Sequence, residues 1–164
     1  MVEIRAARED DVPAMLEIYN DIILTTTAVW HNDPHTLKMR QEWFALKQEQ
    51  GYPVFVAMEG EQLVGFSTIG PFRPWYGYRF TVENSVYVAA SSRGKGIAKL
   101  LMQPLINAAK ELGLHAVVAG IEAENETSLG LHKTFGFVEV AHFKQVGYKF
   151  DRWLDLKFLE LVFD

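Results

Sequence analysis

Apolar residues in this chain follow two spacings, one typical of strands and the other of helices. Segments in which they alternate with polar residues, or run unbroken, predict strands. Segments in which they recur every three or four residues, with Asp, Asn or Pro before and Gly after, predict helices. In order, we predict a strand at Val2–Arg5, a helix from Asp10 or Asp11, a helix from Asp33-Pro34 to Gly51, strands at Pro53–Met58, Leu63–Thr68 and Phe80–Val88, a helix to Leu112, a strand at His115–Ile121, a helix at Asn125–Phe135, and strands at Phe137–His142 and Trp153–Val162. This βααβββαβαββ order predicts a single α/β domain, residues 1–164, with a mixed central sheet.

The composition excludes several kinds of chemistry. The 164 residues include no cysteine, which excludes disulfides, thiolate metal sites and a cysteine nucleophile. The net charge of -5 argues against a nucleic-acid-binding surface. His31 and His35 lie close together, but Pro34 interrupts them and no further ligand is apparent, so we expect no metal. No signal-peptide core or membrane-spanning run is present, and we expect a cytoplasmic protein without membrane association.

The segment from Arg93 to Lys99, between a predicted strand and a predicted helix, carries the most specific signal. Gly94 and Gly96 allow main-chain N–H groups to approach a ligand closely, and the helix N-terminus adds partial positive charge. Arg93, Lys95 and Lys99 add full charges. We therefore expect a pyrophosphate group to bind here. An ATP-binding Walker loop needs Ser or Thr after Gly-Lys, and a dinucleotide fingerprint needs a third glycine where Lys99 stands, so neither ligand is favoured.

Arg93–Ala98 resembles the Arg-x-x-Gly-x-Ala pyrophosphate loop of the GNAT superfamily of N-acetyltransferases, whose donor is acetyl-coenzyme A. Asn125, at the next strand-to-helix junction, and Gly136-Phe137, after the following helix, extend the resemblance over almost the whole chain. Longer segments resemble the phosphinothricin and methionine-sulfoximine acetyltransferase branch, namely Gly77–Val88, Val118–Ile121 and Gly147–Asp155. The resemblance implies the GNAT fold, a homodimer, and acetylation of the α-amine of a small amino acid or analogue.

The resemblance also implies a cofactor site along the third long strand and the loop after it. Main-chain groups of Val86, Tyr87 and Val88 would pair with the pantetheine arm as with an added strand, and one amide would polarise the thioester carbonyl. Asn125 would hydrogen-bond the pantetheine or cap its helix, or both. His132 stands where many members of the superfamily carry a tyrosine that protonates the departing thiolate, and we favour cofactor contact over proton donation for His132. The expected cofactor contacts are Val86, Tyr87, Val88, Arg93, Gly94, Lys95, Gly96, Ile97, Ala98, Lys99, Asn125 and His132.

Glu83 is the residue that we expect to serve the reacting amine. An amine is protonated at neutral pH, so a proton acceptor is needed, and Glu83 ends a strand just before the cofactor segment. It could equally grip the substrate ammonium or pair with Arg79. The aromatic loop Pro71–Arg79 should be buried, either around the substrate, with Arg73 or Arg79 as the partner of its carboxylate, or in a subunit interface. The expected substrate contacts are Arg73, Pro74, Trp75, Tyr78, Glu83, Asn84 and Ser85.

Three functions remain open at this stage. The first is acetyl transfer from acetyl-CoA to a free amino acid, of the phosphinothricin, methionine sulfoximine or methionine sulfone type. The second is a coenzyme A-binding module that senses acetyl-CoA without turnover, against which Glu83 beside an intact loop argues. The third is acetylation of a protein or peptide, although an aromatic loop is better suited to enclosing a small molecule.

Overall fold

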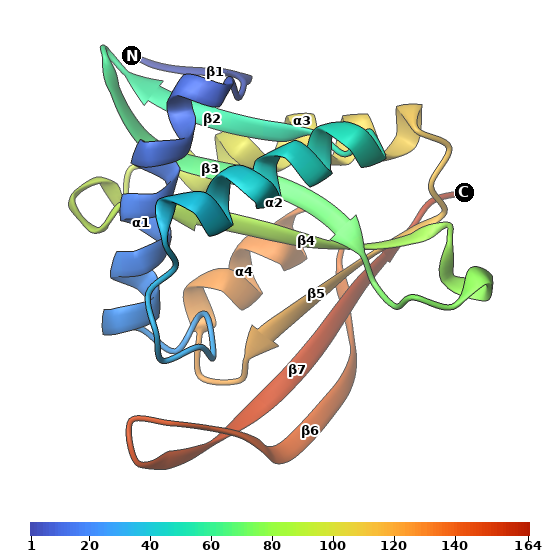
Figure 1. Ribbon diagram of the computed structural model, residues 1–164. Coiled ribbons are helices and arrows are strands. Elements are labelled where there is room, and N and C mark those ends of the chain that lie inside the picture. Colours follow the sequence, from blue (N-terminus) through green and yellow to red (C-terminus); the bar gives the residue numbers. More distant parts are fainter.

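One seven-stranded sheet runs through the computed structural model, which describes residues 1–164 (Figure 1). Its strands are β1 (Val2–Ala6), β2 (Val54–Glu59), β3 (Gln62–Pro71), β4 (Thr81–Val88), β5 (Ala116–Glu122), β6 (Val138–Lys149) and β7 (Arg152–Val162). They lie in the order β1-β2-β3-β4-β5-β7-β6. Only β4 and β5 run parallel, and every other neighbouring pair is antiparallel. The predicted element order and mixed sheet are confirmed.

Helices cover both faces of this sheet. They are α1 (Val12–Thr25), α2 (Leu37–Gln50), α3 (Ile97–Glu111) and α4 (Glu126–Thr134), with short 3-10 turns η1 (Glu9–Asp11), η2 (Tyr76–Tyr78) and η3 (Ala90–Ser92). On one face α1 and α2 bury a cluster that includes Met15, Phe44 and Phe66. On the other face α3 and α4 bury a second cluster that includes Met102 and Leu129. None of the helices is long and apolar enough to cross a membrane.

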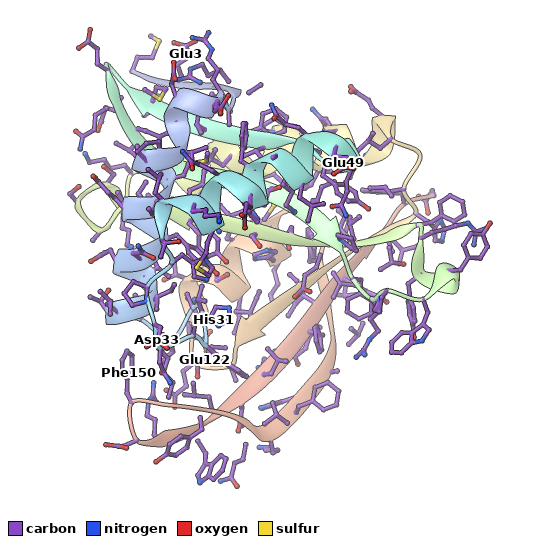
Figure 2. All side chains as sticks on the ribbon, in the orientation of Figure 1. Glu3, His31, Asp33, Glu49, Glu122 and Phe150 are labelled. Atoms are coloured by element: carbon purple, nitrogen blue, oxygen red, sulfur yellow. The ribbon has the colours of Figure 1, made fainter.

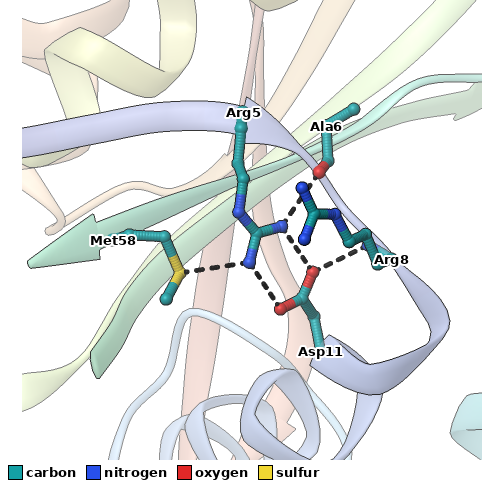
Figure 3. A network of polar contacts seen from close by, with 5 residues as sticks. All are labelled: Arg5, Ala6, Arg8, Asp11 and Met58. Atoms are coloured by element: carbon teal, nitrogen blue, oxygen red, sulfur yellow. Dashed lines mark hydrogen bonds and ion pairs between the residues drawn. The ribbon is translucent and has the colours of Figure 1, made fainter. Parts of the chain in front are cut away.

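The first helix is anchored to the first strand rather than capped in the predicted way. The Asp11 carboxylate accepts hydrogen bonds from the Arg5 guanidinium at 2.7 and 2.9 Å and from the Arg8 main-chain N–H at 2.7 Å (Figure 3). It makes no capping bond to α1. The charge-assisted bond from Arg5 is the main reason that the pKa of Asp11 is lowered.

The second helix begins later than predicted. Its cap is Thr36, whose hydroxyl accepts from the Met39 N–H at 3.2 Å, and the helix starts at Leu37. The predicted start at Asp33-Pro34 is therefore wrong, and Pro34 belongs to the connection between α1 and α2. A threonine whose hydroxyl accepts a hydrogen bond from a main-chain N–H favours a helix start more strongly than a proline, which is only compatible with the first helical position.

Strand β6 continues seven residues beyond its predicted end at His142. Its register against β7 shifts twice, between Glu139 and Ala141 and between Phe143 and Gly147. At the second irregularity Gln145 takes a φ of 52°, and its N–H donates to the Asp155 carboxylate at 2.8 Å. Such bulges break the alternation of apolar and polar residues, which is why the pattern did not reveal the rest of the strand.

The β6–β7 hairpin is fastened to the connection between α1 and α2 by a buried lysine. Lys149 is 3% exposed, and its ammonium donates to the carbonyl oxygens of Ile23, Thr26 and Val29 at 2.6, 2.8 and 2.5 Å. Trp30 lies directly on Gly147, where any Cβ would clash with the indole ring. Figure 1 shows the connection and the hairpin tip at the same end of the sheet.

Candidate active site

Strands β4 and β5 separate just after Glu83. β4 pairs with β5 only at Thr81–Glu83, whereas its pairing with β3 continues to Val88. One edge of β4 is therefore without a strand partner from Asn84 onward. Because the Ala89 N–H donates to the Val64 carbonyl and antiparallel ladders alternate, the main-chain groups of Tyr87 also turn towards β3.

The main-chain groups of Val86 and Val88 consequently turn towards the open edge of β4. The Val88 carbonyl at this edge accepts from the Arg93 guanidinium at 3.3 Å. Of the three expected main-chain contacts, the geometry therefore favours Val86 and Val88, and it pairs Tyr87 with β3 instead. An extended ligand with its own amide groups would complete the ladder at this edge.

The loop after β4 leads into an open helix N-terminus. Gly94 and Gly96 both have a φ of 79°, a backbone conformation that residues with a side chain rarely adopt. Gly96 occupies the N-cap position of α3 without any side-chain capping bond, and a Cβ there would meet nothing within 4 Å. The first N–H groups of α3, those of Ile97, Ala98 and Lys99, therefore have no intrahelical partner. Arg93, Lys95 and Lys99 are exposed around this end of the helix, as an anion site requires.

Glu83 is half-buried on the face of β4 that is turned towards α1 and α2. Burial raises the pKa of its carboxyl group, and the nearby positive charge of Arg73 partly opposes this. No hydrogen bond from the protein contributes to its pKa. A Cβ at Gly120 of β5 would lie only 3.0 Å from Glu83 Oε1. The side chain of Glu83 thus lies over β5, at the place where the two strands part.

Aromatic and apolar side chains of β7 lie on the same side of Gly120 as this carboxylate. The position of a Cβ on Gly120 is also in contact with Phe158 and Leu156 of β7. The ring of Phe158 packs edge-on against Phe72 at 6.1 Å and against Phe143 at 5.8 Å between centroids. Sequence reasoning did not identify this wall, although the alternation of β7 places Leu156 and Phe158 on one face.

A second carboxylate that was not predicted lies on the same face. Glu122 is two residues beyond Gly120 on β5, so its side chain shares that face, and Figure 2 shows it near the end of the strand. It is 6% exposed, and burial raises the pKa of its carboxyl group. One of its oxygens accepts from the Glu124 N–H at 3.1 Å, which fixes the turn into α4.

The aromatic loop between β3 and β4 is only partly as expected. Trp75 is 63% exposed and Tyr76 is 77% exposed in the single chain, so the rest of this chain does not bury the loop, and its burial against a substrate or a second subunit stays a prediction. Arg73 is close enough to Glu83 to affect its pKa. Arg79 is not, because its guanidinium stacks over Tyr76 at 4.1 Å and donates to the Tyr76 carbonyl. The structure therefore favours Arg73 over Arg79 as the acceptor-side arginine.

The residues of this loop differ in whether they contact the aromatic wall beside Glu83. Tyr78 packs on Phe72 at 5.7 Å, which joins it to the aromatic wall beside Glu83. Trp75 lies 6.3 Å from Tyr78, and its own ring remains exposed. Pro74 is exposed next to it. Tyr78 is thus continuous with the Glu83 face, whereas Pro74 and Trp75 lie further out.

The neighbours of Glu83 on β4 divide between the two faces of the sheet. Ser85 shares the face of Glu83 with Tyr87, whose pKa burial raises to about 12. Asn84 lies on the opposite face, where its amide nitrogen is 3.0 Å from His132 Nε2 and 3.6 Å from Met102 Sδ. Although Asn84 was expected among the substrate contacts, it therefore lies on the side of α3 and α4.

Asn125 caps the helix that carries His132. Its side-chain oxygen accepts from the Ser128 N–H at 3.1 Å, which confirms the predicted capping role. His132 is buried, and burial lowers its pKa. No group of three or more His, Asp or Glu side chains in the chain is arranged to hold a metal ion.

Together, these features are suited to acyl transfer from an extended anionic carrier. The open β4 edge offers main-chain partners, the α3 N-terminus offers uncapped N–H groups, and Glu83 offers a proton acceptor where the strands part. The residues present thus fit acetyl-CoA, because its pantetheine arm carries amides and its pyrophosphate carries negative charge.

Comparison with known proteins agrees with this arrangement. Residues 15–137 match the acetyltransferase (GNAT) family. The chain is 46% identical over 162 residues to the L-methionine sulfoximine/L-methionine sulfone acetyltransferase of Pseudomonas aeruginosa, covering 98% of this chain and 94% of the relative. It is 35% identical over 162 residues to the phosphinothricin N-acetyltransferase of Streptomyces coelicolor, covering 97% and 95%.

Two solved structures are similar over nearly their full lengths. The yncA acetyltransferase of Salmonella typhimurium, solved with its cofactor acetyl-CoA, has a TM-score of 0.98 and 42% identity, covering 99% of this chain and 94% of that one. The ribosomal-protein-alanine N-acetyltransferase of Brucella melitensis has a TM-score of 0.97 and 45% identity, covering 98% and 99%. From its sequence match and its fold, the chain belongs to the acetyltransferase (GNAT) family.

Proposed function

We propose that this acetyltransferase transfers acetyl from acetyl-CoA to the α-amine of a small amino acid of the methionine sulfoximine, methionine sulfone or phosphinothricin type. The observation that carries the proposal is the carboxylate of Glu83, half-buried and without a hydrogen-bond donor from the protein, at the point where β4 and β5 separate. The names of the relatives support this class of acceptor. The exposed aromatic loop that carries Arg73 supports recognition of a free carboxylate.

In the mechanism that we propose, acetyl-CoA supplies an activated acetyl thioester, and residues of the chain accept the proton of the amine and stabilise the carbonyl oxygen. Glu83 accepts a proton from the substrate ammonium, directly or through water, so that the amine can attack the thioester carbonyl. The C–N bond forms and the C–S bond breaks, and coenzyme A leaves as a thiolate that takes up the second proton lost by the nitrogen. The raised pKa of Glu83 brings it nearer to the operating pH, which makes it a better base than an exposed carboxylate. An N–H at the open β4 edge, that of Val86 or Val88, stabilises the charge that develops on the carbonyl oxygen.

Arg73 is proposed to hold the α-carboxylate of the acceptor. The positive charge of Arg73 is close enough to oppose the rise in the pKa of Glu83 that burial causes, and a guanidinium pairs with a carboxylate through two parallel hydrogen bonds. Phe72, Phe143 and Phe158 would then face the side chain of the acceptor. In this proposal, Arg73 binds the carboxylate of one small molecule while Glu83, of opposite charge, faces its amine.

Product analysis by mass spectrometry tests the proposal. Purified protein is incubated with acetyl-CoA and a panel that contains methionine sulfone, methionine sulfoximine, phosphinothricin, their decarboxylated amines, and a peptide with an N-terminal alanine. We expect N-acetylation of the amino acids and little of the amines. Preferential acetylation of the peptide would instead support the protein acetyltransferase function, which the Brucella relative makes the second candidate.

Arg73→Ala refines the test. Losing a charge-assisted bond worth about 1.5–3 kcal/mol should lower kcat/KM for methionine sulfone about 10- to 100-fold but leave its decarboxylated amine little changed. Any damage to the fold cancels in this comparison, because both acceptors are measured on both proteins. Equal losses for the two acceptors would remove Arg73 from the acceptor site.

We also propose that the chain works as a homodimer in the cytoplasm. The support for the dimer is the exposure of Trp75, Tyr76 and Phe80 in the loop that carries Arg73, since a second copy would cover these rings. Light scattering of the wild type and of a Trp75→Ser, Tyr76→Ser variant tests this. A wild-type monomer at micromolar concentration would refute it.

A further inference from the structure

Asn84 holds a buried polar atom that nothing in the protein satisfies. The residue is 8% exposed, and its Oδ1 is one of only two fully buried side-chain nitrogen or oxygen atoms without a hydrogen-bond partner. Its amide nitrogen is occupied, since it donates to His132 Nε2 at 3.0 Å. A buried acceptor without a donor costs free energy, so its persistence points to a donor that binds there.

His132 determines which way the Asn84 amide points. Its Nδ1 is 2.7 Å from the Ser128 carbonyl oxygen, which can only accept, so Nδ1 carries the proton. In the neutral ring Nε2 must then accept, and its neighbour must be the NH₂ group of Asn84. Burial lowers the pKa of His132, which favours the neutral ring. The lone pair of Nε2 is thus in use and Nε2 has no proton to give, which argues against a catalytic acid here.

The position of this pair along the chain indicates the missing donor. Asn84 is the first residue of β4 beyond its pairing with β5, and the open edge at Val86 and Val88 follows it. His132 lies on α4, whose N-terminal cap is Asn125. The orphaned oxygen is therefore at the start of the open edge where the pantetheine arm is expected, and that arm carries two amide N–H donors.

We propose that Asn84 contacts the cofactor, with its side-chain oxygen accepting a hydrogen bond from a pantetheine amide N–H of acetyl-CoA, and that His132 is the positioning residue that orients this amide. The inference concerns only the cofactor half of the reaction. It rests on the use of acetyl-CoA by this family and does not depend on the identity of the acceptor.

Calorimetry without any acceptor tests the contact. Coenzyme A is compared with two analogues in which one or the other pantetheine amide NH is replaced by an ester oxygen. We expect Asn84→Leu to bind coenzyme A about two- to tenfold more weakly than the wild type, as loss of one hydrogen bond predicts. The wild type should lose a similar factor with one of the two analogues, whereas Asn84→Leu should bind that analogue and coenzyme A alike.

Two outcomes would overturn the contact. If Asn84→Leu binds coenzyme A as tightly as the wild type does, a water molecule satisfies Oδ1 and the cofactor does not. If both proteins lose the same factor with each analogue, the amide that matters meets another residue. Gly130→Ala on α4 is the matched control, because a Cβ there would meet nothing within 4 Å.

The role of His132 has its own test. His132→Phe cannot accept from Asn84, and we expect it to weaken coenzyme A binding about as much as Asn84→Leu, with no further loss in the double variant. His132→Gln retains an acceptor and should restore most of the affinity. Nitrogen NMR of the ligand-free wild type at neutral pH should show a proton on Nδ1 and none on Nε2. A proton on Nε2, or no rescue by Gln, would refute the positioning role.

Discussion

Gly120 leaves room for the Glu83 carboxylate, and Gly120→Ala is therefore the sharpest test of the site. Gly120 does not have a positive φ, so alanine can adopt its backbone conformation without strain. Its new Cβ, however, would stand 3.0 Å from Glu83 Oε1, 3.4 Å from Phe158 and 3.7 Å from Leu156. The first of these distances is shorter than ordinary van der Waals contact, so the flexible carboxylate has to move.

The size of the effect follows from these distances. Ordinary contact begins near 3.4 Å, so the carboxylate must shift by about 0.4 Å. A misplacement of about 1 Å costs about 100-fold in rate, so a shift of this size predicts a loss of about three- to tenfold in kcat/KM. Global stability should stay within about 1 kcal/mol of the wild type, because alanine restricts the unfolded chain and offsets the close contact.

Steady-state kinetics and thermal unfolding of Gly120→Ala and of Gly130→Ala measure the two effects. Gly130 is also a glycine with no positive φ, but a Cβ there meets nothing within 4 Å, so its variant should keep full activity. The added methyl also desolvates Glu83 further, which should move the acidic limb of the pH profile upward. Full activity of Gly120→Ala with an unchanged pH profile would show that the position of Glu83 does not matter.

Three more predictions test other parts of the site. Glu83→Gln should lower kcat about 10²- to 10⁴-fold and remove the acidic limb of the pH profile, whereas a raised KM with unchanged kcat would make Glu83 a binder of the ammonium. The same variant should raise the melting temperature at neutral pH, because folding raises the pKa of Glu83 and the ionised carboxylate therefore lowers stability above that pKa. Gly96→Val should abolish calorimetric binding of coenzyme A and also lower stability by about 1–2 kcal/mol, because valine is strained at a φ of 79°; retained affinity would show that the loop does not hold the pyrophosphate. Lys149→Met should lower the free energy of unfolding in urea by about 2–4 kcal/mol, since three carbonyl groups lose their donor, and Lys149→Arg should lower it less; equal stability of Met and wild type would mean that water replaces the ammonium.

The features that the sequence predicted well are those with local causes. The spacing of apolar residues in strands and helices follows from burial on one face, and nearly every element predicted from it is present in the structure. The loop from Arg93 to Gly96 was recognisable because its glycines sit where the backbone has a φ of 79°. Asn125 was predicted as a cap for the same kind of reason, since the bond that it accepts spans only three residues.

The features that it missed depend on residues far apart in the chain. Lys149 bonds to the Ile23 carbonyl across 126 positions, and no local pattern predicts that partner. The wall of Phe143 and Phe158 depends on a register that two bulges have shifted. The composition of the aromatic loop predicted that something covers it, but composition does not say whether a substrate or a second copy does, and within the single chain its rings are exposed.

The alternation of β4 separates the two halves of the reaction onto opposite faces of one strand. Glu83 and Ser85 point towards α1 and α2 with the proposed acceptor residues, whereas Asn84 and its partner His132 lie among α3 and α4. A change at Glu83 or Gly120 should therefore alter acceptor kinetics with little effect on coenzyme A affinity, and a change at Asn84 should do the reverse. A single strand can keep these effects independent only if its register is fixed, and the pairing of β4 with β3 from Val82 to Val88 fixes it.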